Sequence, residues 1–311
     1  MQLIRGIDQL SENNKPSVVS IGNYDGVHLG HQHVIKTLLE KSKSLQAPST
    51  VITFEPLARE FFQPDSIMRI TSIEKRAEYL FELGVDQVLC IEFNQELASS
   101  SPQDFVEKVL IGGLGVKYLC VGDDFRFGKD RAGDFEFLKK VGQQNSFEVT
   151  AHDTFTLDGQ RVSSGRVREA ILAADFDLAE QLLGRPFSVT GRVEKGQQLG
   201  RTIQFPTANI AISHPLIAIN GVYCVSVEML DGETPGRQLT GVANVGIRPT
   251  VDGKEKRLEV HLFDFDEEVY GQTLQVQFHK KIRDEQKFDS VELLKKQITK
   301  DAQQALSYFS V

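Results

Sequence analysis

At 311 residues, with 40% hydrophobic and 25% charged side chains, the chain has the composition of a soluble globular protein and is long enough for two domains. Its net charge of -8 argues against a dedicated nucleic-acid binder, which usually presents a basic face. No apolar run resembles a signal peptide or a membrane span, and the three isolated cysteines suit a reducing compartment, so we expect a cytoplasmic protein.

Strands and helices alternate through the first half. Apolar runs predict strands over 17–21, 49–54, 87–91, 116–121 and 147–150, and helical spacing predicts helices over 32–43, 71–83, 102–110, 135–143 and 166–174. Ser72 and Ser101 are candidate N-caps, and Pro102 occupies the first helical position after Ser101. This alternation predicts an α/β domain with a parallel sheet and crossover helices.

The stretch from Gly22 to His31 joins the first strand to the first helix. It holds three glycines and two histidines where a ligand meets the carboxyl end of a strand and the N-terminus of a helix. Glycine allows the backbone to approach an anion closely, and histidine donates hydrogen bonds or transfers protons near neutral pH. The pattern favours phosphate chemistry at His28 and His31. Two alternatives stay open, ordinary turn residues and a metal pair, although no third ligand with suitable spacing is nearby.

A second polar stretch, residues 122–128, follows the strand predicted over 116–121. Its phenylalanines could cover the faces of a flat polar ring while Asp123 and Asp124 accept the N–H groups of that ring. The position at the carboxyl end of a strand favours a binding role. An ordinary surface loop anchored by Phe125 and Phe127 is the alternative.

A third stretch opens the helix predicted over 166–174. Ser163 and Ser164 precede Arg166 and Arg168, and two hydroxyls with two guanidinium groups at a helix N-terminus suit an anion. A serine N-cap with solvated arginines would look the same in isolation.

The pattern changes after Gly184 and Pro186, which we take as the boundary between the domains. Short alternating runs predict strands over 187–193, 221–230, 239–245, 258–263 and 274–280, which is typical of a small antiparallel β-barrel. A terminal amphipathic helix follows, with Asp289 as candidate N-cap and Glu292 completing a capping box. The side chains expected on its apolar face are Val291, Leu294, Ile298 and Ala305.

Two features of the second half could carry chemistry. Glycines at 196 and 200 allow phosphate approach, and Thr207 and Asn209 point the same way in an extended segment, offering the oxygen ligands that Mg²⁺ prefers. Glu259 lies opposite the apolar face of its strand, where a carboxylate could act as a general base. The alternatives are a loop between strands and a solvent-facing glutamate.

The histidine stretch, with its His-x-Gly-His core, resembles the signature of the nucleotidylyltransferase superfamily. Together with residues 122–128 and 162–168, it resembles the FMN adenylyltransferase module of prokaryotic bifunctional riboflavin kinase/FAD synthetases. The resemblance implies a Rossmann-like domain over 1–183 that transfers the adenylyl group of ATP to FMN with Mg²⁺, and that His28 and His31 bind the ATP phosphates and stabilise the transition state. The implied ATP-binding residues are Gly22, Asn23, Asp25, Gly30, Ser163, Ser164 and Arg168, and the implied flavin-binding residues are Asp124, Phe125 and Arg126.

Pro206-Thr207-Ala208-Asn209, preceded by Leu199-Gly200-Arg201, is similar to the Pro-Thr-Ala-Asn motif of the riboflavin kinase module in the same family. The resemblance implies a kinase domain over 184–311 in which Thr207 and Asn209 bind Mg²⁺ and ATP. Glu259 matches the catalytic glutamate that takes the proton of the ribityl 5′-hydroxyl. Residues 244–250 would form a flap. The implied ATP-binding residues are Gly196, Gly200, Arg201, Thr207 and Asn209, and Arg283 would border the flavin.

Two residues depart from the family pattern. Gly165 stands where many members carry threonine, so one hydroxyl contact is lost, which is worth about 0.5–1.5 kcal/mol. Tyr24 stands where phenylalanine is common.

We therefore expect a bifunctional enzyme that converts riboflavin to FMN and FMN to FAD, with ATP as co-substrate in both reactions. We expect no nucleic-acid or membrane partner, and a monomer or weak homo-oligomer. Two other hypotheses are a flavin-responsive protein without turnover and a nucleotidylyltransferase for another acceptor with a nucleic-acid-binding barrel. The acidic pI near 5.5 counts against the latter.

Overall fold

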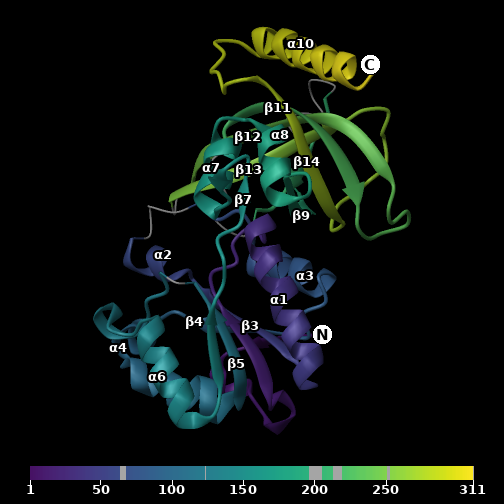
Figure 1. Ribbon diagram of the computed structural model, residues 1–311. Helices are drawn as coiled ribbons and strands as arrows, with labels where there is room; N and C mark the ends of the chain where they lie inside the picture. The colour runs from purple at the N-terminus through teal and green to yellow at the C-terminus, as the bar shows by residue number, and fades with distance from the viewer. Residues whose placement is uncertain (64–67, 123, 196–204, 213–218, 251–252, 311) are drawn as a thin grey trace. The chain divides into compact units, whose positions relative to one another are not determined.

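The computed structural model describes residues 1–63, 68–122, 124–195, 205–212, 219–250 and 253–310, with the backbone alone described at 247–250 and 253–256 (Figure 1). The chain divides into two compact units. One comprises residues 1–67 and 71–164, and the other comprises residues 68–70 and 165–311.

A six-stranded parallel sheet forms the centre of the first unit, as predicted. Its strand order is β1-β4-β3-β2-β5-β6, so the chain builds outward from β2 first toward β3 and β4 and then toward β5 and β6. Such a reversal opens a crevice at the carboxyl ends of β2 and β5. The strands are β1 (Gln2–Arg5), β2 (Ser17–Ile21), β3 (Ser49–Glu55), β4 (Gln87–Glu92), β5 (Val116–Val121) and β6 (Glu148–Ala151), with a small hairpin of β7 (Thr156–Leu157) and β8 (Gln160–Arg161).

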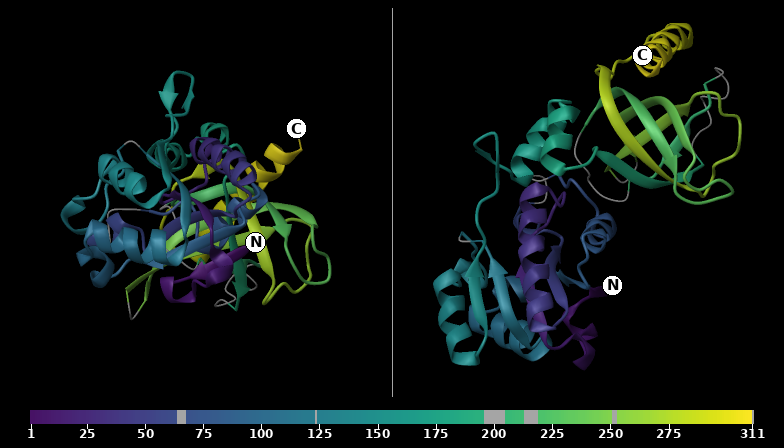
Figure 2. Two further views of the ribbon diagram at one scale, coloured as in Figure 1. Left: turned by 60° about the horizontal axis from the view of Figure 1, so that its bottom comes forward. Right: turned by 45° about the vertical axis from the view of Figure 1, so that its right-hand side comes forward.

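Helices cover both faces of this sheet (Figures 1 and 2). Val34 and Leu38 of α1 and Leu80 of α3 pack into one apolar cluster, and Leu138 of α6 and Leu110 pack into the other. The α-helices are α1 (Leu29–Leu45), α2 (Ala58–Phe62), α3 (Ile73–Glu82), α4 (Gln95–Ser99), α5 (Pro102–Phe105) and α6 (Phe135–Asn145), and α5 continues as a π-helix, η3 (Val106–Gly113). Short 3₁₀ turns are η1 (Ile7–Gln9), η2 (Glu12–Asn14) and η4 (Lys129–Arg131).

Local capping chemistry explains both the agreements and the shifts in helix bounds. The predicted N-caps Ser72 and Ser101 are confirmed, since each hydroxyl accepts a hydrogen bond from the backbone N–H three residues on. Helix α1 begins at Leu29 rather than at residue 32 because the His28 side chain serves as its N-cap. The four-residue edge strand β1 was not predicted, since only Leu3 and Ile4 are apolar there.

The second unit is a closed antiparallel barrel with the strand order β10-β13-β12-β11-β14-β9, which confirms the predicted barrel. Its strands are β9 (Ser188–Glu194), β10 (Ala208–Ile210), β11 (Gly221–Met229), β12 (Gln238–Thr250), β13 (Gly253–Leu262) and β14 (Thr273–Arg283). Among the described residues, helices α7 (Ser164–Leu172), α8 (Phe176–Leu183) and α10 (Val291–Phe309) accompany it. Because β10 has only three residues, the sequence pattern did not distinguish it from a loop.

Alternation along the strands fills the barrel. Leu258, Val260 and Leu262 are buried, whereas Glu259 between them is only half-buried. Helix α10 lies against the outer surface of the barrel, where its Ala302 and Ala305 join the apolar side chains Val222, Cys224 and Val242 in one cluster (Figure 2).

The start of α10 corrects one prediction. Ser290, not Asp289, is the N-cap, because its hydroxyl accepts from the Leu293 N–H at 3.2 Å. The helix therefore begins one residue later than expected, and Val291 is 59% exposed instead of lying on the apolar face. Leu294 and Ile298 are half-buried and Ala305 is fully buried, as the pattern predicted.

Candidate active sites

The loop after β2 has a strained backbone. Tyr24 and Val27 have φ angles of 49° and 40°, and Gly26 between them has 84°. A positive φ is a true outlier for a β-branched residue such as valine, and strain of this kind concentrates at ligand sites. The loop follows a central strand beside the β2–β5 crevice, so its shape suits a bound ligand.

The two histidines meet at the N-terminus of α1. Their rings stack with centroids 3.6 Å apart at 17°, and the ring of Tyr24 lies 4.9 Å from His31. The Nδ1 atom of His28 accepts a hydrogen bond from the His31 N–H at 3.3 Å, so the ring proton of neutral His28 resides on Nε2. His28 is 5% exposed, and its N–H donor therefore lies in a partly desolvated site at the positive end of a helix dipole.

Gly30 keeps this arrangement closely packed. A Cβ atom at this position would lie 3.1 Å from the His28 ring and 3.1 Å from the Val162 carbonyl oxygen. The Tyr24 ring, which contacts His31, is held by a hydrogen bond between its hydroxyl and Ser20 Oγ at 2.6 Å, and burial raises the pKa of Tyr24. Gly30 and Tyr24 thus both pack closely against the histidine pair.

Asp25 braces the loop from within. It is fully buried, and its Oδ1 accepts from the backbone N–H of Thr71 at 3.0 Å and from the Thr71 hydroxyl at 3.2 Å. Its backbone carbonyl accepts from Ser164 Oγ at 2.9 Å. Two residues predicted to bind ATP, Asp25 and Ser164, are therefore joined directly, although their sequence positions differ by more than a hundred residues.

A buried arginine that the sequence reasoning missed supports the same loop. Arg76 of α3 is fully buried and donates from Nη1 to Thr53 Oγ1 at 3.0 Å, and Thr53 donates to the Asn23 carbonyl at 3.0 Å. A signal was present, since helical spacing puts Arg76 on the same face as Ile73 and Leu80. A charged residue at a core position of an amphipathic helix suggests a specific partner.

The segment after β5 holds the predicted ring-binding residues. Phe125 stacks on Phe127 at 5.5 Å and 16°, Asp124 is exposed, and its carboxylate lies 3.8 Å from the guanidinium of Arg161. The Arg126 guanidinium donates to the Phe125 carbonyl at 3.1 Å. Asp123 lies outside the described residues. The aromatic pair beside an acidic side chain agrees with a site for a flat, polar ring.

A second aromatic group lies at the same edge of the sheet and was not anticipated. Phe54 is the penultimate residue of β3, and Phe93 follows β4. Phe61 and Phe62 of α2 contact Phe93 at 5.5 and 5.8 Å. Phe62 is 65% exposed, so its ring is accessible to a ligand at this edge of the sheet.

The remaining predicted residues of this site lie in separate places. Asn23 is exposed and Ser163 is half-buried. A Cβ atom added at Gly22 would lie 3.1 Å from the Tyr24 ring. Arg168 belongs to the second compact unit, where its Nε donates to the Met68 carbonyl at 2.7 Å.

In the barrel, four polar residues occupy one row across neighbouring strands. Asn209 of β10 pairs in register with Glu259 of β13 and with Glu194 of β9, and Glu259 pairs with Asn244 of β12. Directly opposed residues of antiparallel strands project to the same face, with Cβ atoms about 4.5–5.5 Å apart. The register thus brings together Asn209 and Glu259, which lie far apart in the sequence.

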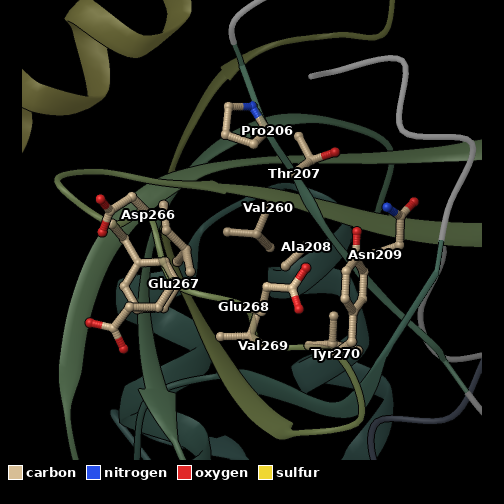
Figure 3. Close-up of a pocket in the computed structure, with 13 residues that line it drawn as sticks. Pro206, Thr207, Ala208, Asn209, Val260, Asp266, Glu267, Glu268, Val269 and Tyr270 are labelled. Carbon is tan, nitrogen blue, oxygen red and sulfur yellow. The ribbon is translucent and has the colours of Figure 1, made fainter. Parts of the chain in front are cut away.

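A pocket of about 490 Å³ lies beside Thr207 and Asn209 (Figure 3). Ala208 and Val260 give it an apolar wall, and Glu268 and Tyr270 line it from the segment after β13. A polar rim around an apolar wall is typical of small-molecule sites of this size.

The other residues predicted for the barrel site lie in an ion pair, in a strand or outside the described residues. Arg283 forms a two-pronged ion pair with Asp301 of α10, with Nε to Oδ1 at 3.1 Å and Nη2 to Oδ2 at 2.8 Å. Residues 244–250 belong to β12, in an extended hairpin with β13. Gly196, Gly200 and Arg201 lie outside the described residues.

Comparisons with known proteins cover both units. A family model described as FAD synthetase matches residues 10–166, and one described as riboflavin kinase matches residues 183–309. A bifunctional riboflavin kinase/FMN adenylyltransferase from Pseudomonas fluorescens is 49% identical over 302 residues, covering 97% of this chain and 96% of the relative. The protein of the same name from Escherichia coli K12 is 45% identical, covering 100% and 99%.

One solved structure shares the fold along most of the chain. Named as a macrolide-efflux protein from Streptococcus pneumoniae, it is 30% identical, has a TM-score of 0.79 and covers 97% of both chains. Within the part of the chain that the structure describes, no helix combines the length and apolar character that crossing a bilayer requires.

Proposed function

Because this chain belongs to the family of bifunctional riboflavin kinase/FMN adenylyltransferases, we propose how its own residues divide the two reactions. The chain phosphorylates riboflavin to FMN and adenylylates FMN to FAD, with the adenylyltransferase module first in the chain and the kinase module second. We assign the modules to residues 1–183 and 184–311, which counts α7 and α8 with the first module although both helices cluster with the barrel in the second compact unit. The observation that carries the assignment is that each unit has its own cluster of residues suited to phosphate transfer, around His28 and His31 in one and around Asn209 and Glu259 in the other.

In the adenylyltransferase reaction, a phosphate oxygen of FMN attacks the α-phosphorus of ATP, and the bond to the β-phosphate oxygen breaks to release pyrophosphate. No protein nucleophile is needed, so the residues contribute position and charge stabilisation. We assign His28 Nε2–H and the N–H groups at the start of α1 to the phosphate oxygens, because the hydrogen bond at Nδ1 leaves the ring proton on Nε2. His31, stacked on His28, is the second phosphate donor.

The other predicted residues have supporting or binding roles in this proposal. Gly22, Asn23, Asp25 and Gly30 shape the loop around the phosphates, and Ser163, Ser164 and Arg168 bind the triphosphate. Asp124, Phe125 and Arg126 contact the flavin. The exposed ring of Phe62 is a second candidate for stacking on the flavin, since it lies at the same carboxyl edge. A Phe125→Ala variant that raises the KM for FMN while Phe62→Ala does not would favour the first position, and the reverse would favour the second.

In the kinase reaction, Glu259 accepts the proton of the ribityl 5′-hydroxyl as that oxygen attacks the γ-phosphorus of ATP and ADP leaves. The half-buried position of Glu259 beside two asparagines keeps the carboxylate in a fixed place. We assign the nucleotide to the pocket beside Thr207 and Asn209, with Gly196, Gly200 and Arg201 contributing from the preceding segment and Arg283 bordering the flavin.

Mg²⁺ is the proposed metal of the kinase site. The donor set fits, because the Thr207 hydroxyl, the Asn209 amide oxygen and nucleotide phosphates are the hard oxygen ligands that this ion prefers. When bound, Mg²⁺ neutralises charge on the transferred phosphate groups. Thr207 and Asn209 would hold it within reach of the pocket.

The test is direct. Purified protein receives riboflavin, ATP and MgCl₂, and the flavins are separated by chromatography. Formation of FMN followed by FAD supports the proposal, and absence of both products contradicts it. Omitting Mg²⁺ should stop both steps. Persistence of FMN formation in EDTA would contradict the metal assignment.

We also propose that the protein acts in the cytoplasm as a monomer or weak homo-oligomer. The buried, unpaired thiols of Cys90, Cys120 and Cys224 agree with a reducing compartment. A molar mass measured by light scattering across a range of concentrations tests the oligomeric state, and a stable oligomer at low concentration would contradict it.

A further inference from the structure

His261 lies on the same strand as the proposed general base. It follows Glu259 by two residues in β13, so both side chains project to the outer face of the barrel. Its Nδ1 atom lies 2.8 Å from the Pro206 carbonyl oxygen. Because a carbonyl oxygen only accepts, the imidazole donates this bond, and its proton resides on Nδ1.

Aromatic neighbours fix the orientation of this ring. Phe205 lies edge-to-face against it at 5.2 Å and 68°, and Phe263 does the same at 5.8 Å and 79°. Edge-to-face contacts of this kind hold a ring in one rotamer and keep the hydrogen bond aligned. The aromatic contacts and the hydrogen bond thus stabilise the same orientation of the imidazole ring.

The hydrogen bond acts where the barrel ladder does not reach. Strand β10 begins at Ala208, so Thr207 precedes the first ladder pair, and Pro206 before it has no N–H to donate. The hydrogen bond from His261 to the Pro206 carbonyl therefore connects β13 to the segment two residues before the first backbone pair of β10. Thr207 lies between these two attachment points, so the hydrogen bond helps to fix its position.

We propose that His261 is a positioning residue of the kinase site, which ties the carbonyl before Thr207 to the strand that carries Glu259. The inference rests on the proposed kinase roles of Thr207 and Glu259. Through this tie, the segment that binds Mg²⁺–ATP keeps a fixed distance from the base that activates the hydroxyl. His261 itself takes no proton from the substrate.

A positioning role differs from a role as base in its response to pH. The Nδ1–H group donates to a backbone carbonyl and transfers no proton to or from the substrate. Replacement by a residue with an amide donor at the same place should therefore leave the pH dependence of phosphorylation unchanged. Loss of a catalytic base would instead remove one limb of the pH profile.

Three variants of the full chain separate these possibilities. In His261→Asn, the side-chain amide nitrogen occupies nearly the place of Nδ1, whereas in His261→Gln it lies farther out, and His261→Ala has no donor. All three lose the ring, so their differences report the hydrogen bond and not the aromatic contacts. Adenylylation of added FMN, which uses the other unit, reports on the integrity of the chain in each sample.

We expect His261→Ala to raise the KM for Mg²⁺–ATP in riboflavin phosphorylation by about threefold to tenfold, the effect of one hydrogen bond. His261→Asn should restore the KM to near that of the unmodified protein, and His261→Gln should not. The kcat and its pH profile should change little in the three variants.

The inference is overturned if His261→Asn and His261→Ala have the same KM, or if kcat falls while KM is unchanged. If the unmodified protein forms no FMN, the proposed function fails. If it forms FMN and His261→Ala behaves identically, the positioning role alone fails. Thermal unfolding of the three variants tests a purely structural role, since equal kinetics with unequal Tm values would also overturn the inference.

Discussion

Asn209 of β10 and Glu259 of β13 lie directly opposite each other in the closed barrel, although they are separated by fifty residues of sequence. Each belongs to a different motif, one a predicted Mg²⁺–ATP ligand and the other a predicted general base. The antiparallel register brings both side chains to one face, with Asn244 beyond Glu259 and Glu194 beyond Asn209. In the proposed kinase site, this pairing brings the predicted metal ligand and the predicted base together from two strands of the barrel.

The first prediction concerns the base. Glu259→Gln retains the shape of the side chain but cannot take a proton, so FMN formation should fall by about a hundredfold or more. Conversion of added FMN to FAD should remain within about twofold, since the other unit carries it out. Glu228→Gln on β11, whose register partners are Gln238 and Gln275, is the matched control and should leave both reactions unchanged. Loss of FAD formation in a folded Glu259→Gln protein would contradict the two-site assignment.

The second prediction uses the space at Gly30. In Gly30→Ala, the new Cβ atom would lie 3.1 Å from the His28 ring and from a backbone oxygen that cannot move freely. The His28 ring must shift by a few tenths of an ångström, and FAD formation should fall by several-fold, because the proposed phosphate donor then loses its alignment. Riboflavin phosphorylation should be unaffected. Lys36→Ala, at an exposed position of the same helix, serves as the control, and equal FAD formation by both variants would contradict the assignment.

The third prediction concerns Arg76. Arg76→Ala removes the donor to Thr53 and loosens the tie to the Asn23 carbonyl, so both stability and FAD formation should decrease. Hydrogen bonds from charged groups are worth about 1.5–3 kcal/mol, which should appear as a lower urea midpoint for the first unit. Arg76→Lys should recover part of the loss, and Glu82→Ala on the exposed side of α3 should change neither quantity. A fully stable, fully active Arg76→Ala protein would exclude a supporting role.

The residues of the two sites show which features can be predicted from the sequence and which cannot. His28 and His31 were predicted at a strand–helix junction because local signals, an apolar run and then helical spacing with glycines, define such a junction. The opposition of Asn209 and Glu259 was not predicted, because register between distant strands depends on the whole barrel. The partners of Arg76 and His261 were missed for the same reason, since Thr53 and Pro206 are remote in sequence, although helical spacing alone places Arg76 on the buried face of α3. At the start of α10, Asp289 and Ser290 are both suitable N-cap residues. The capping-box pattern favoured Asp289, because the sequence does not show which side chain reaches the backbone N–H.

The fourth prediction concerns the contribution of the Arg283–Asp301 ion pair to stability. Its side chain is 16% exposed and that of Asp301 is 4% exposed, so the pair is largely desolvated. Asp301→Asn should lower the unfolding free energy of the second unit by about 3–5 kcal/mol, because it leaves a buried charge without its partner. Asp284→Asn, in the exposed ion pair with Lys281, should cost about 0–1 kcal/mol. Similar urea midpoints for the two variants would show that the Arg283–Asp301 pair does not anchor α10.

The fifth prediction follows from His279, whose Nε2 lies 2.8 Å from Ser226 Oγ and whose ring contacts Phe309 of α10. Burial lowers the pKa of His279 below its usual value, with Glu180 opposing this shift. The unfolded chain therefore binds a proton at His279 from about pH 6.5 downward, while the folded chain does so only at lower pH. The stability contributed by neutral His279 is fully present above that pH and decreases as the pH falls through the window between the two pKa values.

We expect the urea midpoint of the second unit to decline more steeply between pH 7 and pH 5 in the unmodified protein than in His279→Gln, which does not titrate. His33→Gln, at an exposed position of α1, is the control, and parallel pH profiles for His279→Gln and the unmodified protein would show that His279 is not the group responsible.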